Sequence, residues 1–231
     1  LAQLAPEDLD ALELLVTAGE PPQVDQALQL SRRLRYVNAY GPTETTVCAT
    51  WHRVDPDGQY DGVIPIGQPI ANCEVLILDD RGQLAPIGVP GEICIGGRGL
   101  ARGYLNQSAL TAQSFVAHPF RAGTRLYRTG DVGCRRADGE ILFLGRNDRQ
   151  VKVRGHRIEL DEIEHRLLEH PQIKQAAVVV HDANGSGMDL AAYVVHDSPL
   201  AIESLREHLG KKLPVYMIPA YWVELSSLPL L

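Results

Sequence analysis

The sequence has no apolar run that approaches the roughly 18 to 20 residues a membrane-spanning helix needs. It also lacks a surplus of positive charge, because 22 Lys and Arg residues against 29 Asp and Glu residues give a net charge of −7. A nucleic-acid-binding surface would need a basic face. We therefore expect no membrane and no nucleic acid among the partners of this chain.

Signals for export, disulfides and metal binding are missing as well. The chain begins with Leu1 and carries no targeting segment, so we expect a piece of a longer protein. Widely spaced cysteines without a C-x-x-C pair predict reduced core thiols in a cytoplasmic protein. They are Cys48, Cys73, Cys94 and Cys134. The histidines make no metal-ligand pattern, and we expect His165 and His170 on different faces of a helix, both solvated.

The composition that remains, 45% hydrophobic and 22% charged residues over 231 positions, is typical of a packed chain. Its first part alternates helix-like and strand-like segments, which favours an α/β sheet. The strand-like runs are Leu14–Ala18, expected to be buried on both faces, and residues 35–40. The helix-like segments are residues 6–12 and 21–30.

From about residue 55 the pattern changes to short β-type runs between Gly, Pro and Asp clusters, which favours a small sheet or barrel. The runs are residues 74–78, 92–95 and 140–144. A third pattern of strands and helices begins near Arg149. Its segments are strands at 150–154, 176–180 and 190–195, a hairpin-type link at 184–187, and helices at 161–169 and 199–213.

A boundary near Asp148 separates the third pattern from the first two. All four lysines lie after residue 151, which is a change in composition at the same place. We therefore expect two domains. Residues 1–148 would hold the α/β and β-rich subdomains, and residues 149–231 an α+β lobe.

The densest polar cluster is Tyr40-Gly41-Pro42-Thr43-Glu44-Thr45-Thr46, directly after a strand-like run. Ligands of α/β sheets bind at the carboxyl ends of strands. Hydroxyls and backbone amides suit phosphate oxygens, and a lone carboxylate suits Mg²⁺. A capped helix start, with Glu44 complementing the helix dipole, explains the cluster equally well. The spacing alone leaves both interpretations open.

Two other glycine-containing segments also allow two interpretations. Residues 96–104 lack the Gly-Lys-Ser/Thr ending of a phosphate loop, so simple backbone turns are favoured. In Thr129-Gly130-Asp131 an acid follows a glycine. Such a carboxylate can accept both hydroxyls of a ribose. On the residues alone, an aspartate in a surface turn is favoured.

Five motifs occur in order along nearly the whole chain. They are Asn38–Glu44 (NAYGPTE), Gly91–Gly97 (GEICIGG) with Ala101–Leu105 (ARGYL), Tyr127–Asp131 (YRTGD), Gly145–Leu160 (GRNDRQVKVRGHRIEL) and Leu213–Pro219 (LPVYMIP). Together they resemble the adenylate-forming enzymes, and specifically the amino-acid-activating adenylation domains of nonribosomal peptide synthetases. The resemblance implies the later part of that fold: the end of an α/β sheet subdomain, a small β-barrel subdomain and a hinged α+β C-terminal lobe.

The resemblance also implies a reaction. An amino acid and ATP would form an aminoacyl-adenylate, with Mg²⁺ as cofactor and pyrophosphate as product. The acyl group would then pass to the phosphopantetheine thiol of a peptidyl carrier (thiolation) domain, and a condensation domain would lie in the same assembly line.

By motif position, the resemblance assigns Tyr40 to stack on adenine and Asn38 to hydrogen-bond its amino edge. Asp131 would bind the ribose hydroxyls, with Arg146 beside it.

Gly41 belongs to the same ATP-binding turn, in which Thr43 would hold the α-phosphate and Glu44 would ligate Mg²⁺. The expected catalytic residues are Thr43, Glu44 and Arg146, because attack on the α-phosphorus builds negative charge on phosphate oxygens.

In the C-terminal lobe, the resemblance makes Asp148 the hinge and places Lys152 and Gly155 in a segment that lines the thiol's approach. It also implies an amino-acid pocket whose visible residues are uncharged and small to medium. They are Val16, Ala18, Ala39, Val47 and Cys48. Because a buried charge would find no partner there, we expect a large apolar side chain, with phenylalanine first and tyrosine second.

Some expected groups are not within the sequence. The glycine-rich phosphate loop and the amine-binding aspartate would precede Leu1, and a catalytic lysine would follow Leu231. Residues 1–231 alone are therefore expected to be inactive. Two alternatives stay open: an acyl- or aryl-CoA ligase of the same superfamily, and a non-catalytic scaffold remnant.

Overall fold

The computed structural model describes residues 11–182, 188–196 and 200–229. The chain divides into two compact units, Leu1–Asn147 and Asp148–Leu231. Most of the expected helix at 6–12 and the expected link at 184–187 lie outside the described residues.

The first unit begins with a four-stranded sheet in the order β1-β2-β3-β4. Its elements are β1 (Leu14–Ala18), α1 (Val24–Ser31), β2 (Arg35–Tyr40), β3 (Thr50–Arg53) and β4 (Gln68–Pro69). Strands β1 and β2 are parallel, and the others pair antiparallel. The predicted strands at 14–18 and 35–40 and the predicted helix are confirmed.

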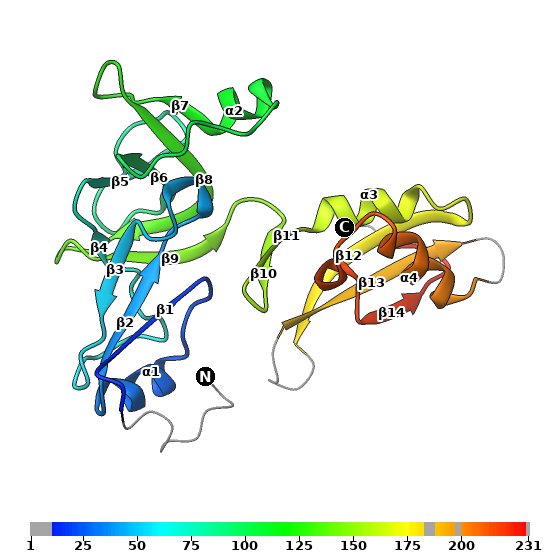
Figure 1. The fold of residues 1–231 in the computed structure, drawn as a ribbon, viewed down its shortest axis with the longest axis horizontal. Coiled ribbons are helices and arrows are strands. Elements are labelled where there is room, and N and C mark those ends of the chain that lie inside the picture. Colours follow the sequence, from blue (N-terminus) through cyan, green and yellow to red (C-terminus); the bar gives the residue numbers. More distant parts are fainter. Residues whose placement is uncertain (1–10, 183–187, 197–199, 230–231) are drawn as a thin grey trace. The chain divides into compact units, whose positions relative to one another are not determined.

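One face of this sheet is covered by α1 (Figure 1), where Ala27 and Leu30 pack near Tyr36 in a buried cluster. The prediction that β1 is buried on both faces is wrong, because Leu14 and Val16 are about half exposed, at 48% and 51%. Among the described residues β1 pairs only with β2, so it is an edge strand. The face of β1 that carries Leu14 and Val16 is also left uncovered.

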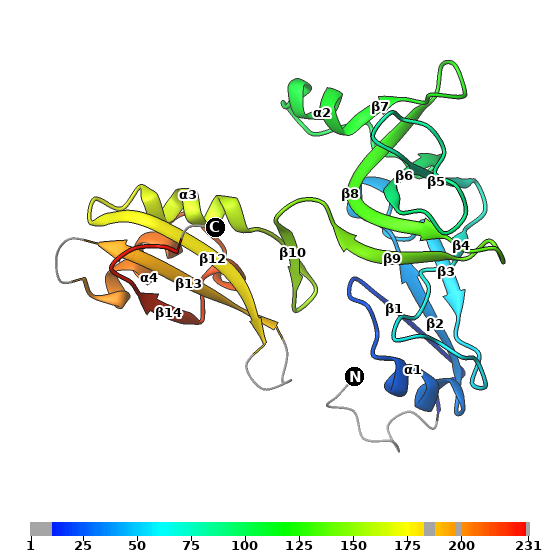
Figure 2. The same ribbon diagram turned by 180° about the vertical axis from the view of Figure 1, so that it is seen from behind.

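The β-rich part of the first unit is an antiparallel half-barrel built around one long strand. Its elements are β5 (Cys73–Leu78), β6 (Gly91–Gly97), α2 (Ser108–Ser114), β7 (Phe115–Ala117), β8 (Arg125–Arg135) and β9 (Ile141–Arg146). Strand β8 pairs with β6, β7 and β9, and Figure 2 shows it curving as it does so. The predicted runs at 74–78, 92–95 and 140–144 all fall on strands, with shifted ends at β6 and β9.

A shared core joins this half-barrel to the first sheet. Tyr40 and Ala49 from the first sheet pack with Ile77 and Ile93 from the second. The Ile141 amide also donates to the carbonyl oxygen of Gly67 at 3.0 Å. Gly67 has a φ of +87°, and a Cβ there would lie 1.8 Å from the Trp51 carbonyl oxygen, so only glycine permits this approach.

The second unit is an α+β lobe with a sheet in the order β12-β13-β14 and a separate β10–β11 hairpin (Figure 1). Its elements are β10 (Gln150–Val153), β11 (His156–Glu159), α3 (Leu160–Leu168), β12 (Ile173–Asp182), β13 (Met188–His196), α4 (Ile202–Gly210) and β14 (Tyr221–Glu224). Both helices and the hairpin contribute to one core, which includes Ile158, Leu167 and Leu205, all at 0% exposure. The predicted strands and helices of this lobe are confirmed.

The prediction about the cysteines is confirmed, and the prediction about His170 is not. All four cysteines are free thiols, and burial raises the pKa of Cys94 to about 12. The solvated position predicted for His170 is wrong: its residue is 8% exposed, and its ring lies edge-on to His208 at 5.2 Å. The packing of α4 against the end of α3 buries it, whereas the His165 side chain is 72% exposed.

Candidate active site

Three of the predicted site residues meet at one buried carboxylate. Asp131 lies in β8 and is 3% exposed. The Tyr40 hydroxyl donates a hydrogen bond to Asp131 Oδ2, and the Arg146 guanidinium donates to Asp131 Oδ1. The register of β8 and β9 places Asp131 opposite Arg146, while Tyr40 comes from the end of β2. Three strands far apart in the sequence therefore build this cluster.

The interpretation of Asp131 as a surface-turn aspartate is wrong, because β8 continues through this position and pairs with both β6 and β9. The preceding Gly130 has a φ of +72° and lies in a strand, next to register shifts in both ladders. Thr129 Oγ1 accepts a hydrogen bond from the Asp131 amide at 2.9 Å and donates to the Ile93 carbonyl oxygen at 2.7 Å. These bonds fix the backbone that presents the carboxylate.

Burial dominates the electrostatics of Tyr40. Desolvation raises its pKa well above the usual value, and the negative charge of Asp131 raises the pKa further. Tyr40 is therefore a protonated hydrogen-bond donor at neutral pH. Its ring lies 6.2 Å from the Phe143 ring, at an angle of 40°. The sequence did not indicate Phe143 as a neighbour of Tyr40. Its aromatic ring is the only feature that distinguishes it within the strand-like run at 140–144.

Asn38 is also buried, at 3% exposure, two positions before Tyr40 on the same strand. Residues two apart in a strand share a face. The Asn38 amide nitrogen donates to the Pro65 carbonyl oxygen at 2.8 Å. This bond sets the orientation of the amide, with its oxygen as the acceptor end.

The segment after β2 is a single 3₁₀ turn, Thr43–Thr45, and not the start of an α-helix. The capped-helix interpretation of Glu44 is therefore wrong. Glu44 is buried, at 9% exposure, and its carboxylate accepts a hydrogen bond from the Tyr104 hydroxyl at 2.7 Å. Thr43 is exposed. A Cβ on Gly41 would meet the Ala49 amide nitrogen at 2.6 Å, so the chain crosses itself too closely there for any side chain.

The glycine-rich segment 96–104 lies against this turn. The Ala101 amide donates to the Glu44 carbonyl oxygen at 2.8 Å, and Thr46 Oγ1 donates to the Gly99 carbonyl oxygen at 2.7 Å. Gly97 and Gly103 have positive φ values of +114° and +146°. Gly99 lies in a turn, as predicted, whereas Gly96 and Gly97 are the last two residues of β6. Tyr104 at the end of the segment was not singled out by the sequence, although it holds the Glu44 side chain.

Three of the predicted amino-acid pocket residues lie on the strands of the first sheet. Ala18 pairs with Ala39 across β1 and β2, and Val16 lies two positions before Ala18, so all three share one sheet face. Val47 and Cys48 lie beyond the 3₁₀ turn; Val47 is 66% exposed and Cys48 is partly exposed. The face also carries Trp51, which pairs with Ala39 from β3 and is 49% exposed.

In the second unit the predicted residues line the start and the tip of the β10–β11 hairpin. Asp148 Oδ1 accepts a hydrogen bond from the Gln150 amide at 3.1 Å. Lys152 is partly buried and pairs with Arg157 across the two strands. Gly155 lies in the hairpin turn with a φ of +77°.

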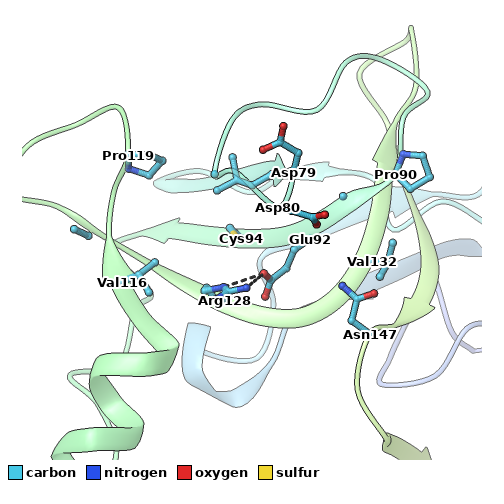
Figure 3. Close-up of a pocket in the computed structure, with 14 residues that line it drawn as sticks. Asp79, Asp80, Pro90, Glu92, Cys94, Val116, Pro119, Arg128, Val132 and Asn147 are labelled. Carbon is cyan, nitrogen blue, oxygen red and sulfur yellow. Dashed lines mark hydrogen bonds and ion pairs between the residues drawn. The ribbon is translucent and has the colours of Figure 1, made fainter.

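A groove of about 500 Å³ lies elsewhere on the half-barrel, between residues of β5, β6 and β8 (Figure 3). The Arg128 side chain crosses it to donate to Glu92 at 2.6 and 2.9 Å. None of the residues that line it is a predicted site residue. The cluster around Asp131 is instead nearly closed in this structure, because Tyr40 and Arg146 cover its carboxylate.

Two absences hold for the part of the chain that the structure describes. No group of three or more His, Cys, Asp and Glu side chains is arranged to hold a metal ion by itself. No helix there has the length and apolar character needed to cross a membrane.

The order of these parts, an α/β sheet followed by a half-barrel and an α+β lobe, defines an incomplete adenylate-forming enzyme fold. Comparisons with known proteins agree. Residues 1–105 match the family described as AMP-binding enzyme, and residues 162–230 match the AMP-binding enzyme C-terminal domain. Tyrocidine synthase 3 of Brevibacillus parabrevis is 50% identical over 97% of this chain, and tyrocidine synthase 1 is 45% identical over all of it.

Solved structures give the same result. A nonribosomal peptide synthetase protein containing adenylation and carrier domains, bound to a vinylsulfonamide inhibitor, matches the whole chain and 40% of its own, with a TM-score of 0.88 and 37% identity. The Vibrio cholerae adenylation domain AlmE, in complex with glycyl-adenosine-5′-phosphate, matches 99% of this chain and 44% of its own, with a TM-score of 0.87 and 29% identity.

The chain spans 4% of the length of tyrocidine synthase 3 and 21% of that of tyrocidine synthase 1. It belongs to the AMP-binding enzyme family, as part of an adenylation domain of the nonribosomal peptide synthetase type.

Proposed function

We propose that the complete domain activates an amino acid with ATP and loads it onto a carrier domain. An aminoacyl-adenylate and pyrophosphate form first, and the acyl group then passes to the phosphopantetheine thiol of a peptidyl carrier domain, with a condensation domain in the same assembly line. The observation that carries this proposal is that Tyr40 and Arg146 both donate hydrogen bonds to the buried Asp131 carboxylate. The adenylation and carrier domains named for the similar structures support it.

The nucleotide would bind at the Asp131 cluster. A carboxylate offers about four lone-pair positions, so Asp131 can accept ribose hydroxyls in addition to the bonds from Tyr40 and Arg146. Because Asp131 is 3% exposed, binding requires the cluster to open. The Tyr40 ring supplies a stacking surface. The Asn38 amide oxygen is an acceptor of the kind that the adenine amino group needs.

The triphosphate would bind at the turn after β2. Thr43 presents an exposed hydroxyl there, and Gly41 keeps the backbone free of side-chain bulk. Glu44 fits a divalent cation, because its carboxylate is a hard oxygen ligand held in place by Tyr104. Mg²⁺ bound there would offset negative charge on the phosphate oxygens. Arg146 would add positive charge at the ribose side of the same site.

The amino-acid side chain would lie on the sheet face that carries Val16, Ala18 and Ala39, with Val47 and Cys48 beyond the turn. The five pocket residues carry no charge themselves. Leaving even a neutral polar group buried without a hydrogen-bond partner costs about 2–7 kcal/mol, and an unpaired charge costs more. A large apolar side chain is therefore favoured, with phenylalanine first. Tyrosine is second, because a hydroxyl needs a single hydrogen-bond partner.

The second unit would act in the transfer step. Asp148 is its first residue, which suits a hinge between the two units. The β10–β11 hairpin would then line the path of the carrier thiol, with Lys152 on its first strand and Gly155 in its turn.

The test is amino-acid-dependent ATP–pyrophosphate exchange by the complete domain, over a panel of all twenty amino acids. We expect phenylalanine or tyrosine to give the highest rate, and the matching carrier domain to be loaded in preference to coenzyme A. Aspartate, lysine or glycine as the best substrate would overturn the pocket assignment. Faster loading of coenzyme A would identify a CoA ligase. The absence of pyrophosphate exchange with all twenty amino acids would identify a non-catalytic scaffold.

A further inference from the structure

The turn of the β10–β11 hairpin has an unusual backbone. Val153 pairs with His156, so Arg154 and Gly155 form a two-residue loop. Both have positive φ values, +52° for Arg154 and +77° for Gly155, as a hairpin turn of type I′ requires. Gly155 adopts this conformation without cost, whereas arginine rarely does. Something else in the lobe must therefore favour the observed position of Arg154.

One side of the turn is held by an ion pair. The Arg154 guanidinium donates to Asp189 Oδ1 at 2.5 Å. Asp189 lies in β13, near the start of a strand in the middle of the lobe's sheet, and its side chain is 22% exposed against 72% for Arg154. The more buried partner is therefore the aspartate on the sheet, and its ion pair directs the arginine side chain toward the sheet.

The other side of the turn is held by an aromatic stack. The His156 ring lies parallel to the Tyr216 ring, with centroids 4.0 Å apart and an angle of 5° between the planes. Tyr216 belongs to the 3₁₀ turn Val215–Met217, which follows α4. The two contacts thus bind the residues immediately before and after Gly155 to different elements of the same lobe.

These contacts are separate from the ones that hold the hairpin in the fold. Val153 and Ile158 anchor its strands in the lobe's core, at 4% and 0% exposure. The ion pair and the stack lie at the surface, where Arg154, His156 and Tyr216 are all exposed. Surface ion pairs add little to stability. Their effect is to select one position for the turn.

We propose that Asp189 and Tyr216 are positioning residues for the transfer step, because they hold the Arg154–Gly155 turn in the shape that admits the carrier thiol. This inference rests on the proposed function. In that step the sulfur forms a bond to the acyl carbon, and the bond from that carbon to the adenylate phosphate oxygen breaks. AMP leaves with the electron pair, and the thiol proton passes to solvent.

The experiment compares the two half-reactions in the complete adenylation domain with its carrier domain. For Tyr216→Ala and Asp189→Asn we expect pyrophosphate exchange within about twofold of wild type, while kcat/KM for carrier loading falls about tenfold or more. Tyr216→Phe keeps the ring and should restore loading. Val215→Ala is the matched control, because Val215 is 84% exposed in the same 3₁₀ turn.

Amide hydrogen exchange of the same proteins tests the positioning directly. In Tyr216→Ala, residues 153–156 should exchange faster while α3 is unchanged. Normal loading, equal losses in both half-reactions, or unchanged exchange at the turn would each overturn the inference. A wild-type domain that shows no pyrophosphate exchange with any amino acid would overturn the proposed function, and this inference with it. If the wild-type domain does load its carrier, a negative result concerns only the roles of Asp189 and Tyr216.

Discussion

The sequence neighbours of Glu44 do not reveal the structure that surrounds its side chain. Its carboxylate is held by Tyr104, which lies sixty positions away in the sequence. Proline and glycine nearby are equally compatible with a helix start, so local pattern could not separate the two interpretations. Only the loop formed by residues 96–104, packed on the 3₁₀ turn, decides against the helix.

We predict that Glu44→Gln weakens the productive complex with Mg²⁺ while the fold persists, because the change is isosteric and removes only the negative charge. Pyrophosphate exchange by the complete domain at low Mg²⁺ should fall about tenfold, equivalent to about 1.4 kcal/mol, and recover in part as Mg²⁺ is raised. Glu140→Gln is the control, since this half-buried carboxylate bonds to His52 at 2.8 Å. An unaltered Mg²⁺ dependence would refute the ligand role of Glu44.

His170 makes the second unit sensitive to acid. Burial, followed by the nearby His208, lowers its pKa below the ordinary 6.5. The unfolded chain then binds a proton at a higher pH than the folded chain does. Stability is therefore complete above pH 6.5 and is lost as the pH falls from there toward the folded pKa.

We expect His170→Asn to reduce this loss, because the amide keeps an acceptor for the Gln172 amide and does not titrate. Urea unfolding at pH 7.5 and 5.5, followed by Trp222 fluorescence in a Trp51→Phe background, measures it. His165→Asn is the control, at 72% side-chain exposure. An equal acid dependence in all three proteins would contradict the assignment to His170.

At the scale of elements, strands with a regular apolar pattern could be predicted, whereas β8, which has two glycines in its interior, could not. The runs at 14–18 and 35–40 match β1 and β2 to the residue, because nothing interrupts them. Strand β8 was missed although it organises the half-barrel. Its Gly130 and Gly133 resemble turn residues locally, and only pairing with β6 and β9 makes them part of a strand.

Helix α3 buries one of two adjacent leucines and exposes the other, whereas the sequence pattern placed both on its apolar side. Leu167 is fully buried in the lobe's core, whereas the next residue, Leu168, is 48% exposed. We predict that Leu167→Ala lowers the free energy of unfolding by about 2–5 kcal/mol, through lost burial and a residual cavity. Leu168→Ala should stay within about 0.5 kcal/mol of wild type. Chemical denaturation measures both, and equal losses would show that the assigned helix face is wrong.

Over the whole molecule, the two units differ in how completely their apolar surfaces are covered. The core of the second unit is formed by its own residues, from Val153 to Met217. The first unit leaves Leu14, Val16 and Trp51 about half exposed on the open face of its first sheet. A sheet face of this kind is a liability in water.

We therefore predict that residues 148–231 fold alone with a cooperative thermal transition, while residues 1–147 alone aggregate or bind a hydrophobic dye. Circular dichroism melting and dye fluorescence of the two pieces measure this. A cooperative, monomeric residues 1–147 would show that the exposed face needs no cover.

The motifs predicted Arg146 beside Asp131, but they did not predict the hydrogen bond from Tyr40 to Asp131. Nothing in the local sequence indicates that Tyr40 donates to Asp131, because ninety-one positions separate them and three strands must pair first. The motifs therefore give the members of the cluster, and the fold gives its geometry.

We propose above that the Asp131 cluster binds the nucleotide of an amino-acid-activating domain. The most direct test is pyrophosphate exchange by the complete domain carrying Asp131→Asn, with ATP varied and the amino acid saturating. Losing one charge-assisted hydrogen bond should cost about 1.5–3 kcal/mol, which raises the KM for ATP roughly 10- to 150-fold. The KM for the amino acid should change far less. Unchanged ATP kinetics, or an equal rise in both constants, would contradict the account.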